Sequence, residues 1–263
     1  MPDWTRGKRT KVCILLGFIL CLTSSFLTFD WTQYYLGVVR ISDPELAYTR
    51  IAKTLTSFLV FLLVLNIGDD GVSIADTRKL RRAFMAIFAG DLLFLLDELH
   101  PAFDYLAVLV FMVGHVLIIL RNGQGVWAYL RAKSAARHRT IDLVTALGVV
   151  FVTAILFVLT LLERLRGSPL LFILVVYAVV LDVSLWTGWT SMRAGYFPRR
   201  NALLIASGAL CFFVGDYLVG FNLTLEPSLA RATTLFATWI FYTPAIALFA
   251  LSGYRWEEQR AKS

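Results

Sequence analysis

The sequence is poor in histidine and cysteine, and it has none of the common hydrolase motifs. Its three histidines are too few for a three-histidine zinc site, since His100 and His138 fall in expected loops. Its three cysteines form no C-x-x-C pair, which argues against a disulfide framework and a structural zinc site. No G-x-S-x-G, H-E-x-x-H or phosphate-binding glycine loop occurs. The sequence therefore predicts neither a serine hydrolase nor a zinc hydrolase, and it implies no metal or other cofactor.

Long polar stretches are also lacking. The 263 residues are 58% hydrophobic with a mean hydropathy of +0.70, and the longest expected connection, 121–140, is too short to be a soluble domain. This composition is typical of a polytopic helical membrane protein. A membrane β-barrel would need short segments of alternating hydropathy, and the continuous apolar run 143–162 excludes it.

Eight stretches are long and apolar enough to cross a membrane as helices. They are 12–29, 47–67, 83–99, 103–120, 141–162, 169–189, 201–221 and 229–251. We therefore expect an all-α fold, a single eight-helix transmembrane domain over residues 1–263.

The basic residues divide unevenly between the two sides of this eight-helix arrangement. The N-terminus, the tail and every second connection carry 19 of the 25 Lys and Arg residues. The positive-inside rule then predicts a multi-pass protein with both termini in the cytoplasm. Basic residues beside helix ends face anionic lipid headgroups, and no separate basic domain is present, so nucleic-acid binding is excluded.

Two Gly-Asp pairs, Gly90-Asp91 and Gly215-Asp216, lie inside apolar stretches. An ionisable residue at such a depth is costly and marks a candidate functional site. Each Asp is followed six positions later by a polar residue, Asp97 and Asn222 respectively. Because the two pairs fall in the third and seventh stretches, the sequence is consistent with a parallel four-plus-four internal repeat.

Other polar residues inside the stretches fall at similar depths, and we expect several of them to converge with the Asp pair. These supporting or substrate-binding candidates are Lys53, His115, Tyr177, Asp182, Asn222 and Tyr242. Structural alternatives remain open. One alternative for Lys53 is that its ammonium extends to the membrane interface, and another is that it forms a structural ion pair with Asp91. His115, Tyr177 and Tyr242 fit interhelical hydrogen bonds, and Asp182 fits a pair with a Ser or Trp donor.

Two carboxyl groups in different surroundings can divide acid and base roles. One donates a proton while the other stabilises a cation or activates water, as in glycoside hydrolysis through an oxocarbenium-like state. The same intramembrane Asp pair would also serve a proton-coupled transporter or a lipid-binding membrane protein.

The order of these residues is similar to that of a known family. Lys53-Thr54-Leu55-Thr56, Gly90-Asp91, His115, Gly215-Asp216 with Asn222, and Phe241-Tyr242 occur in that order between about residue 50 and residue 251. Together they resemble the YhhN-like family of eight-helix membrane proteins, whose characterised members are lysoplasmalogenases.

The resemblance implies hydrolysis of the vinyl ether bond of a lysoplasmalogen to a fatty aldehyde and a glycerophospho-ethanolamine or -choline. It implies that Asp91 and Asp216 are the acid and water-activating pair, in either order. Lys53, His115, Tyr177 and Tyr242 would then tune, orient or bind, and Asn222 would contact the headgroup. The implied partners are the lysophospholipid substrate and membrane lipid.

Overall fold

The computed structural model describes residues 6–35, 47–96, 99–100, 102–132, 136–226 and 228–256. Apart from one isolated β-bridge between Gly71 and Tyr254, all regular structure in these residues is helical, which confirms the all-α prediction. The long helices are α1 (Arg6–Tyr35), α2 (Ala47–Leu65), α3 (Ile74–Leu95), α4 (Ala102–Asn122), α6 (Ala136–Phe157), α7 (Pro169–Ala194), α8 (Arg199–Asn222) and α9 (Leu229–Leu251). The short ones are a 3₁₀ turn (Gly68–Asp70), α5 (Val126–Arg131) and a π turn (Val158–Leu162) that extends α6.

Within the described residues, seven helices are long and apolar enough to cross a membrane, counting α6 together with its π turn. They are α1, α2, α4, α6, α7, α8 and α9. The protein is therefore an integral, multi-pass membrane protein by the length and composition of its helices.

Helix α3 does not meet that criterion, so seven of the eight expected spans are found among the described residues. The helix expected over 83–99 begins at Ile74, because the Ser73 hydroxyl caps it by accepting a 3.1 Å hydrogen bond from the Asp76 amide. The first turns are consequently charged, including Arg78 and Lys79, and lower the hydropathy of the whole helix. Asp97 and Glu98, within the expected stretch, lie outside the described residues. The eighth crossing and the four-plus-four repeat stay predictions.

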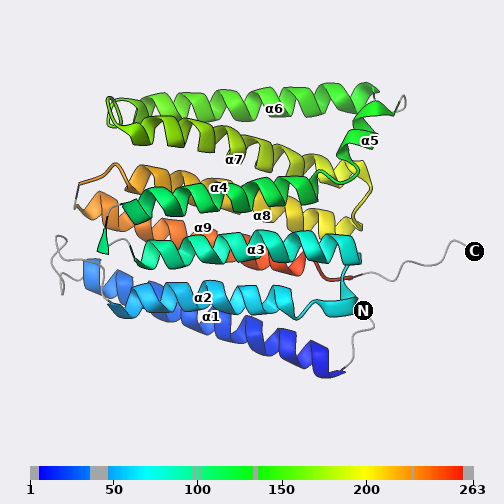
Figure 1. Ribbon diagram of the computed structural model, residues 1–263, viewed down its shortest axis with the longest axis horizontal. Helices are drawn as coiled ribbons and strands as arrows, with labels where there is room; N and C mark the ends of the chain where they lie inside the picture. The colour runs from blue at the N-terminus through cyan, green and yellow to red at the C-terminus, as the bar shows by residue number, and fades with distance from the viewer. Residues whose placement is uncertain are drawn as a thin grey trace, which may run out of the picture.

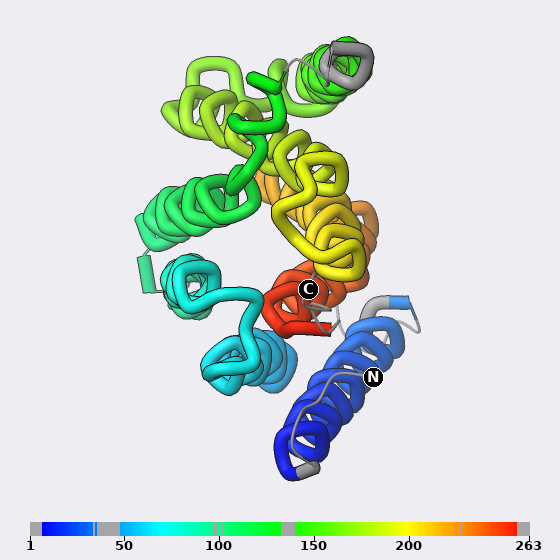
Figure 2. Tube along the Cα trace, turned by 90° about the vertical axis from the view of Figure 1, so that its right-hand side faces the viewer, coloured from blue at the N-terminus to red at the C-terminus, as the bar shows by residue number. Residues whose placement is uncertain are grey.

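The long helices lie side by side and alternate in direction (Figure 1). One end of the bundle, called here the Arg121 end, holds the start of α1 and the ends of α4 and α9. The opposite end, called the Arg50 end, holds the starts of α2, α4 and α9. Seen from the Arg121 end, α1 and α6 lie at opposite edges, with α9 near the middle (Figure 2). The most extensive contacts join α8 to α9 and α3 to α4.

A buried polar clamp closes the Arg121 end. The Arg121 guanidinium donates hydrogen bonds to both carboxylate oxygens of Asp76, at 2.8 and 2.9 Å, and a third to the Ser252 hydroxyl at 2.7 Å. The Asn201 amide donates to the Ser252 and Tyr254 carbonyls at 2.7 and 2.6 Å. All five residues are fully buried. Because a buried charge needs a partner, this clamp fixes the ends of α3, α4, α8 and α9 relative to one another.

Candidate active site: a buried carboxyl pair

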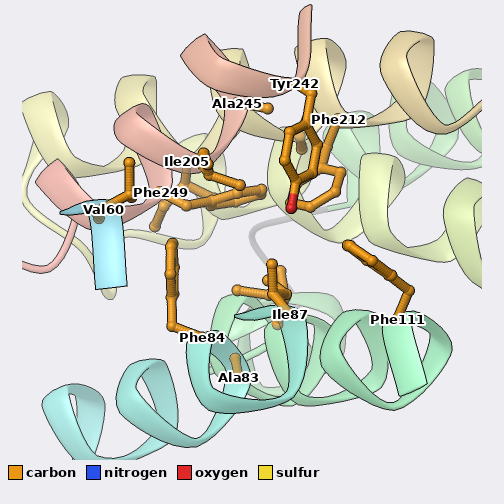
Figure 3. Close-up of a cluster of buried hydrophobic side chains, with 14 of the residues drawn as sticks. Val60, Ala83, Phe84, Ile87, Phe111, Ile205, Phe212, Tyr242, Ala245 and Phe249 are labelled. Carbon is orange, nitrogen blue, oxygen red and sulfur yellow. The ribbon is translucent and has the colours of Figure 1, made fainter. Parts of the chain in front are cut away.

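The Asp91 carboxyl lies on the inner face of α3 and is 8% exposed. The Tyr242 hydroxyl of α9 donates a 2.7 Å hydrogen bond to its Oδ2, and the Ser57 hydroxyl of α2 lies beside it. In Figure 3 the Tyr242 hydroxyl points toward the side of the bundle that carries Ile87 and Phe111. The structure thus brings Asp91 and Tyr242, 151 residues apart, into direct contact.

The Asp216 carboxyl lies on α8, is 6% exposed and has two side-chain partners. The Tyr177 hydroxyl donates to Oδ2 at 2.5 Å, and the His115 Nε2 lies 2.7 Å from the same oxygen. The His115 Nδ1 lies 3.5 Å from the Ser184 hydroxyl, and its ring packs edge-on against Phe212 at 4.5 Å between centroids. If Asp216 is a carboxylate, Nε2 carries the proton of this hydrogen bond.

The two carboxyls belong to one site. The hydrogen-bonding partners of the two carboxyls, His115 and Tyr242, meet at one ring, that of Phe212. The Phe212 ring packs edge-on against the His115 ring at 4.5 Å and against the Tyr242 ring at 5.5 Å between centroids. The structure therefore joins Asp91, Asp216, His115, Tyr177 and Tyr242 in one buried cluster.

The glycine before each Asp permits a close approach of a neighbouring helix. A Cβ on Gly90 would lie 2.4 Å from the Phe111 ring of α4, so any larger residue would displace that ring. A Cβ on Gly215 would lie 3.4 Å from the Tyr242 amide of α9, which is ordinary van der Waals contact. Small residues at such crossings let helix backbones pack closely in membranes.

Lys53 is buried and forms an ion pair that the sequence did not predict. Its ammonium lies 2.9 Å from the Asp30 carboxylate of α1, and each side chain is 4% exposed. The same nitrogen lies 5.7 Å from the ring centroids of Phe26 and Trp239. Trp239 in turn packs edge-on against the Tyr242 ring at 5.1 Å, which connects this ion pair to the carboxyl cluster.

Asp182 and Asn222 form hydrogen bonds with residues other than Asp91, Asp216 and their partners. Asp182 accepts a 2.7 Å hydrogen bond from the Thr153 hydroxyl of α6, between α6 and α7. The Asn222 amide donates to the Arg231 carbonyl at 2.8 Å, where it ties the end of α8 to the start of α9 at the Arg50 end. Both residues join neighbouring helices.

Asp30 and Ser57 are site residues that sequence reasoning missed. Asp30 lies one position beyond the expected stretch 12–29, whereas α1 continues to Tyr35. Ser57 lies one helical turn after Lys53, and that i, i+4 spacing was the available signal. Within the described ranges, no group of three or more His, Cys, Asp or Glu residues has the geometry of a metal site.

These features define a class: a multi-pass helical membrane protein with a carboxyl pair buried between its helices. The YhhN family model matches residues 48–253, so the chain belongs to the YhhN family. Neither a curated protein nor a solved structure matches it. The match begins after α1, so Asp30 lies outside the family region.

Proposed function

We propose that the protein is a lysoplasmalogenase, a hydrolase that cleaves the vinyl ether bond of a single-chain lysophospholipid. The observation that carries the proposal is the pair of buried carboxyls, each held by a tyrosine hydroxyl and one of them by a histidine. Membership of the YhhN family supports the proposal, because the characterised members of this family are lysoplasmalogenases.

The chemistry needs one proton donor and one proton acceptor. A proton is added to the vinyl carbon β to the ether oxygen, which leaves an oxocarbenium ion. Water attacks the carbon next to oxygen, and the acceptor carboxylate takes the proton that this water loses. The hemiacetal then collapses to the aldehyde, and its glycerol oxygen leaves with a proton as the free alcohol. No oxidant or metal is consumed, and a buried site favours this division of roles between two carboxyls.

The surrounding residues fit supporting roles. Tyr177 and Tyr242 orient the carboxyls, His115 supports Asp216, and Lys53 supplies the nearby positive charge. The substrate would enter from the bilayer between helices, with its headgroup at the Arg50 end near Asn222. Asp182 would support the α6–α7 contact. We also propose that α3 is an eighth crossing and that both termini face the cytoplasm.

The direct test is aldehyde release from lysoplasmenylethanolamine by the purified protein in detergent. The wild type should release aldehyde, whereas Asp91→Asn and Asp216→Asn should lose about 10²-fold or more in kcat. The saturated 1-O-alkyl lysolipid is the matched control substrate, because it has no carbon that accepts the proton. A folded wild type that releases no aldehyde would contradict the proposal and favour proton-coupled transport or lipid binding by the same pair.

A further inference from the structure

We propose that Arg164 binds the phosphate of the lysophospholipid substrate, beside the end of α8 that lies beyond Asp216. This inference rests on the proposed function and extends it from the bond that is cleaved to the headgroup that is recognised. Arg164 lies in the turn that follows the π turn of α6, and the end of α6 and the end of α8 both lie at the Arg50 end of the bundle (Figure 1).

The Arg164 guanidinium lies against the end of α8. Its Cζ lies 5.5 Å from the centroid of the Phe221 ring, and its Nη1 lies 3.5 Å from the carbonyl oxygen of Thr224. The side chain is exposed, and among the described residues no carboxylate lies within ion-pair distance of it. A guanidinium has five N–H donors in a planar fork, so one carbonyl contact leaves most of them for a ligand. Such a fork matches the oxygens of a phosphate.

The chain around Arg164 is fixed on both sides. The π turn of α6 packs against α8, and the next residue after Arg164, Leu165, is buried with 4% exposure. The chain then reverses at Gly167, whose φ of +83° is a left-handed conformation that favours glycine. The hydroxyl of Ser168 accepts a 3.2 Å hydrogen bond from the Leu170 amide and so caps α7. Arg164 therefore extends from an anchored turn.

The depth of Arg164 fits the length of the substrate. Phe221, which carries the guanidinium on its ring, lies five residues beyond Asp216, or about 8 Å along the axis of α8. Six bonds separate the vinyl carbon next to the ether oxygen from the phosphorus. Since three backbone bonds span about 3.5 Å in an extended chain, six span about 7 Å. A vinyl ether beside Asp216 thus places its phosphate at the level of Arg164.

Asn222, the residue expected to contact the headgroup, is less suited to a phosphate. Its amide nitrogen already donates to the Arg231 carbonyl at 2.8 Å and to the Thr234 hydroxyl at 3.3 Å. The remaining group of its side chain is a carbonyl oxygen, which accepts hydrogen bonds and repels an anion. Arg164 has the donors and the charge that Asn222 lacks.

The other exposed charges near these helix ends have both signs. They are Glu163, Arg166, Glu226 and Arg231. A zwitterionic headgroup fits such a surface, because its phosphate pairs with a guanidinium while its ammonium group has carboxylates nearby. An exposed arginine at a helix end also contacts the phosphates of the bilayer. The contacts with Phe221 and Thr224 instead hold this guanidinium against the protein, which favours a bound substrate.

Ligand binding in a phosphate-free maltoside detergent tests the site without turnover. The saturated 1-O-alkyl lysophosphoethanolamine, which cannot be hydrolysed, is titrated and its Kd measured by native mass spectrometry. Arg164→Gln should raise this Kd by about 10-fold or more, since it removes a charge-assisted contact. Arg166→Gln, which neutralises an exposed arginine two residues away, is the matched control and should bind as the wild type does.

Two further ligands separate the phosphate of the substrate from other sources. The phosphate-free 1-O-alkylglycerol should bind the wild type and Arg164→Gln equally well. Inorganic phosphate should not displace the lysolipid, because it has no chain that places it at the site. Equal Kd values for the phospholipid analogue in the wild type and Arg164→Gln would overturn the inference. So would equal effects of Arg164→Gln and Arg166→Gln, or displacement by inorganic phosphate, which would indicate a general anion site.

Steady-state kinetics give a second readout. On lysoplasmenylethanolamine, Arg164→Gln should raise KM about 10-fold and change kcat by less than about 2-fold, because the phosphate is held equally before and during proton transfer. A loss of kcat with an unchanged KM would contradict this role. If the Kd values behave as expected and no aldehyde forms, the proposed function fails while the phosphate site stands. If aldehyde forms and Arg164→Gln changes neither Kd nor KM, the inference fails while the proposed function stands.

Discussion

Two tyrosines and one histidine from three different helices hold the carboxyl oxygens of the site. Two of these hydrogen bonds form a reciprocal pattern between the halves of the chain. Tyr242 on α9 contacts Asp91 on α3, while His115 on α4 contacts Asp216 on α8. Each Asp is thus contacted by the helix that follows the other Asp. Within the site, the tyrosine hydroxyls are the groups that can be removed with the least change in shape.

Tyr177→Phe and Tyr242→Phe should each lower kcat by about 10-fold to 100-fold. A hydrogen bond to a charged or catalytic carboxyl contributes about 1.5–3 kcal/mol, and phenylalanine preserves the packing of the ring. Tyr217→Phe is the matched control, because its hydroxyl contacts Thr160 and neither carboxyl. Steady-state rates on lysoplasmenylethanolamine check this, and equal losses in all three variants would count against the specific role of Tyr177 and Tyr242.

At this scale the sequence predicted which residue types lie deep in the bundle but not which way they face. Depth follows from position along a helix, so Asp91, His115, Asp216, Tyr177 and Tyr242 were all expected near one another. The partner of Lys53 was not predictable, because it depends on the rotation of α1 about its axis and on a helix end six residues beyond the expected one.

At the scale of single helices, the two Gly-Asp pairs fix how closely α4 approaches α3 and α9 approaches α8. Phe111 packs over Gly90 and against the Tyr242 ring at 6.1 Å, so the same contact that requires Gly90 also places the donor to Asp91. Gly215 meets the α9 backbone with more space.

Gly90→Ala should therefore be more damaging than Gly215→Ala. The new methyl at residue 90 would overlap the Phe111 ring and push α4 away, which we expect to cost about 1–3 kcal/mol of stability. At residue 215 the methyl makes ordinary contact and should cost less. Thermal unfolding in detergent measures the difference, and an equal or reversed order would show that the helix approach at Gly90 is not tight.

The polar clamp at the Arg121 end should stabilise the fold because its buried charges are paired. Arg121→Met leaves Asp76 buried without its cation and should lower stability by about 3–5 kcal/mol. The double variant Asp76→Leu/Arg121→Met should recover much of that loss, because no charge remains buried. The midpoint of thermal unfolding checks both. A double variant no more stable than Arg121→Met would contradict this account.

Most helix positions could be predicted because the apolar stretches are long, and α9 begins and ends at the expected residues. The start of α3 differs most from the expected one. Its first two turns are charged, and only the Ser73 cap marks the true start, so hydropathy placed that start nine residues late.

For the whole molecule, the alternation of the long helices brings the described part of the basic set toward the Arg121 end, and this supports the proposed orientation. The reciprocal contacts of His115 and Tyr242 favour the four-plus-four repeat. Both ideas depend on α3 crossing the membrane.

Cysteine labelling in intact cells tests that crossing. In a background with Cys13, Cys21 and Cys211 replaced, single cysteines at Asp69 and Arg199 should react only with a permeant reagent. Single cysteines at His100 and Glu163 should react with an impermeant one. Since Asp69 precedes α3 and His100 follows it, labelling of both from one side would show that α3 does not cross.

The most direct test of the central claim is hydrolysis of lysoplasmenylethanolamine in D₂O, with the fatty aldehyde trapped at once and analysed by mass spectrometry. Proton addition to the vinyl carbon by a carboxyl of the site predicts one deuterium at carbon 2 of the aldehyde, formed by the wild type and not by Asp91→Asn. Preformed aldehyde incubated under the same conditions controls for exchange. Aldehyde without deuterium at carbon 2, or labelled aldehyde formed equally well by Asp91→Asn, would contradict the account.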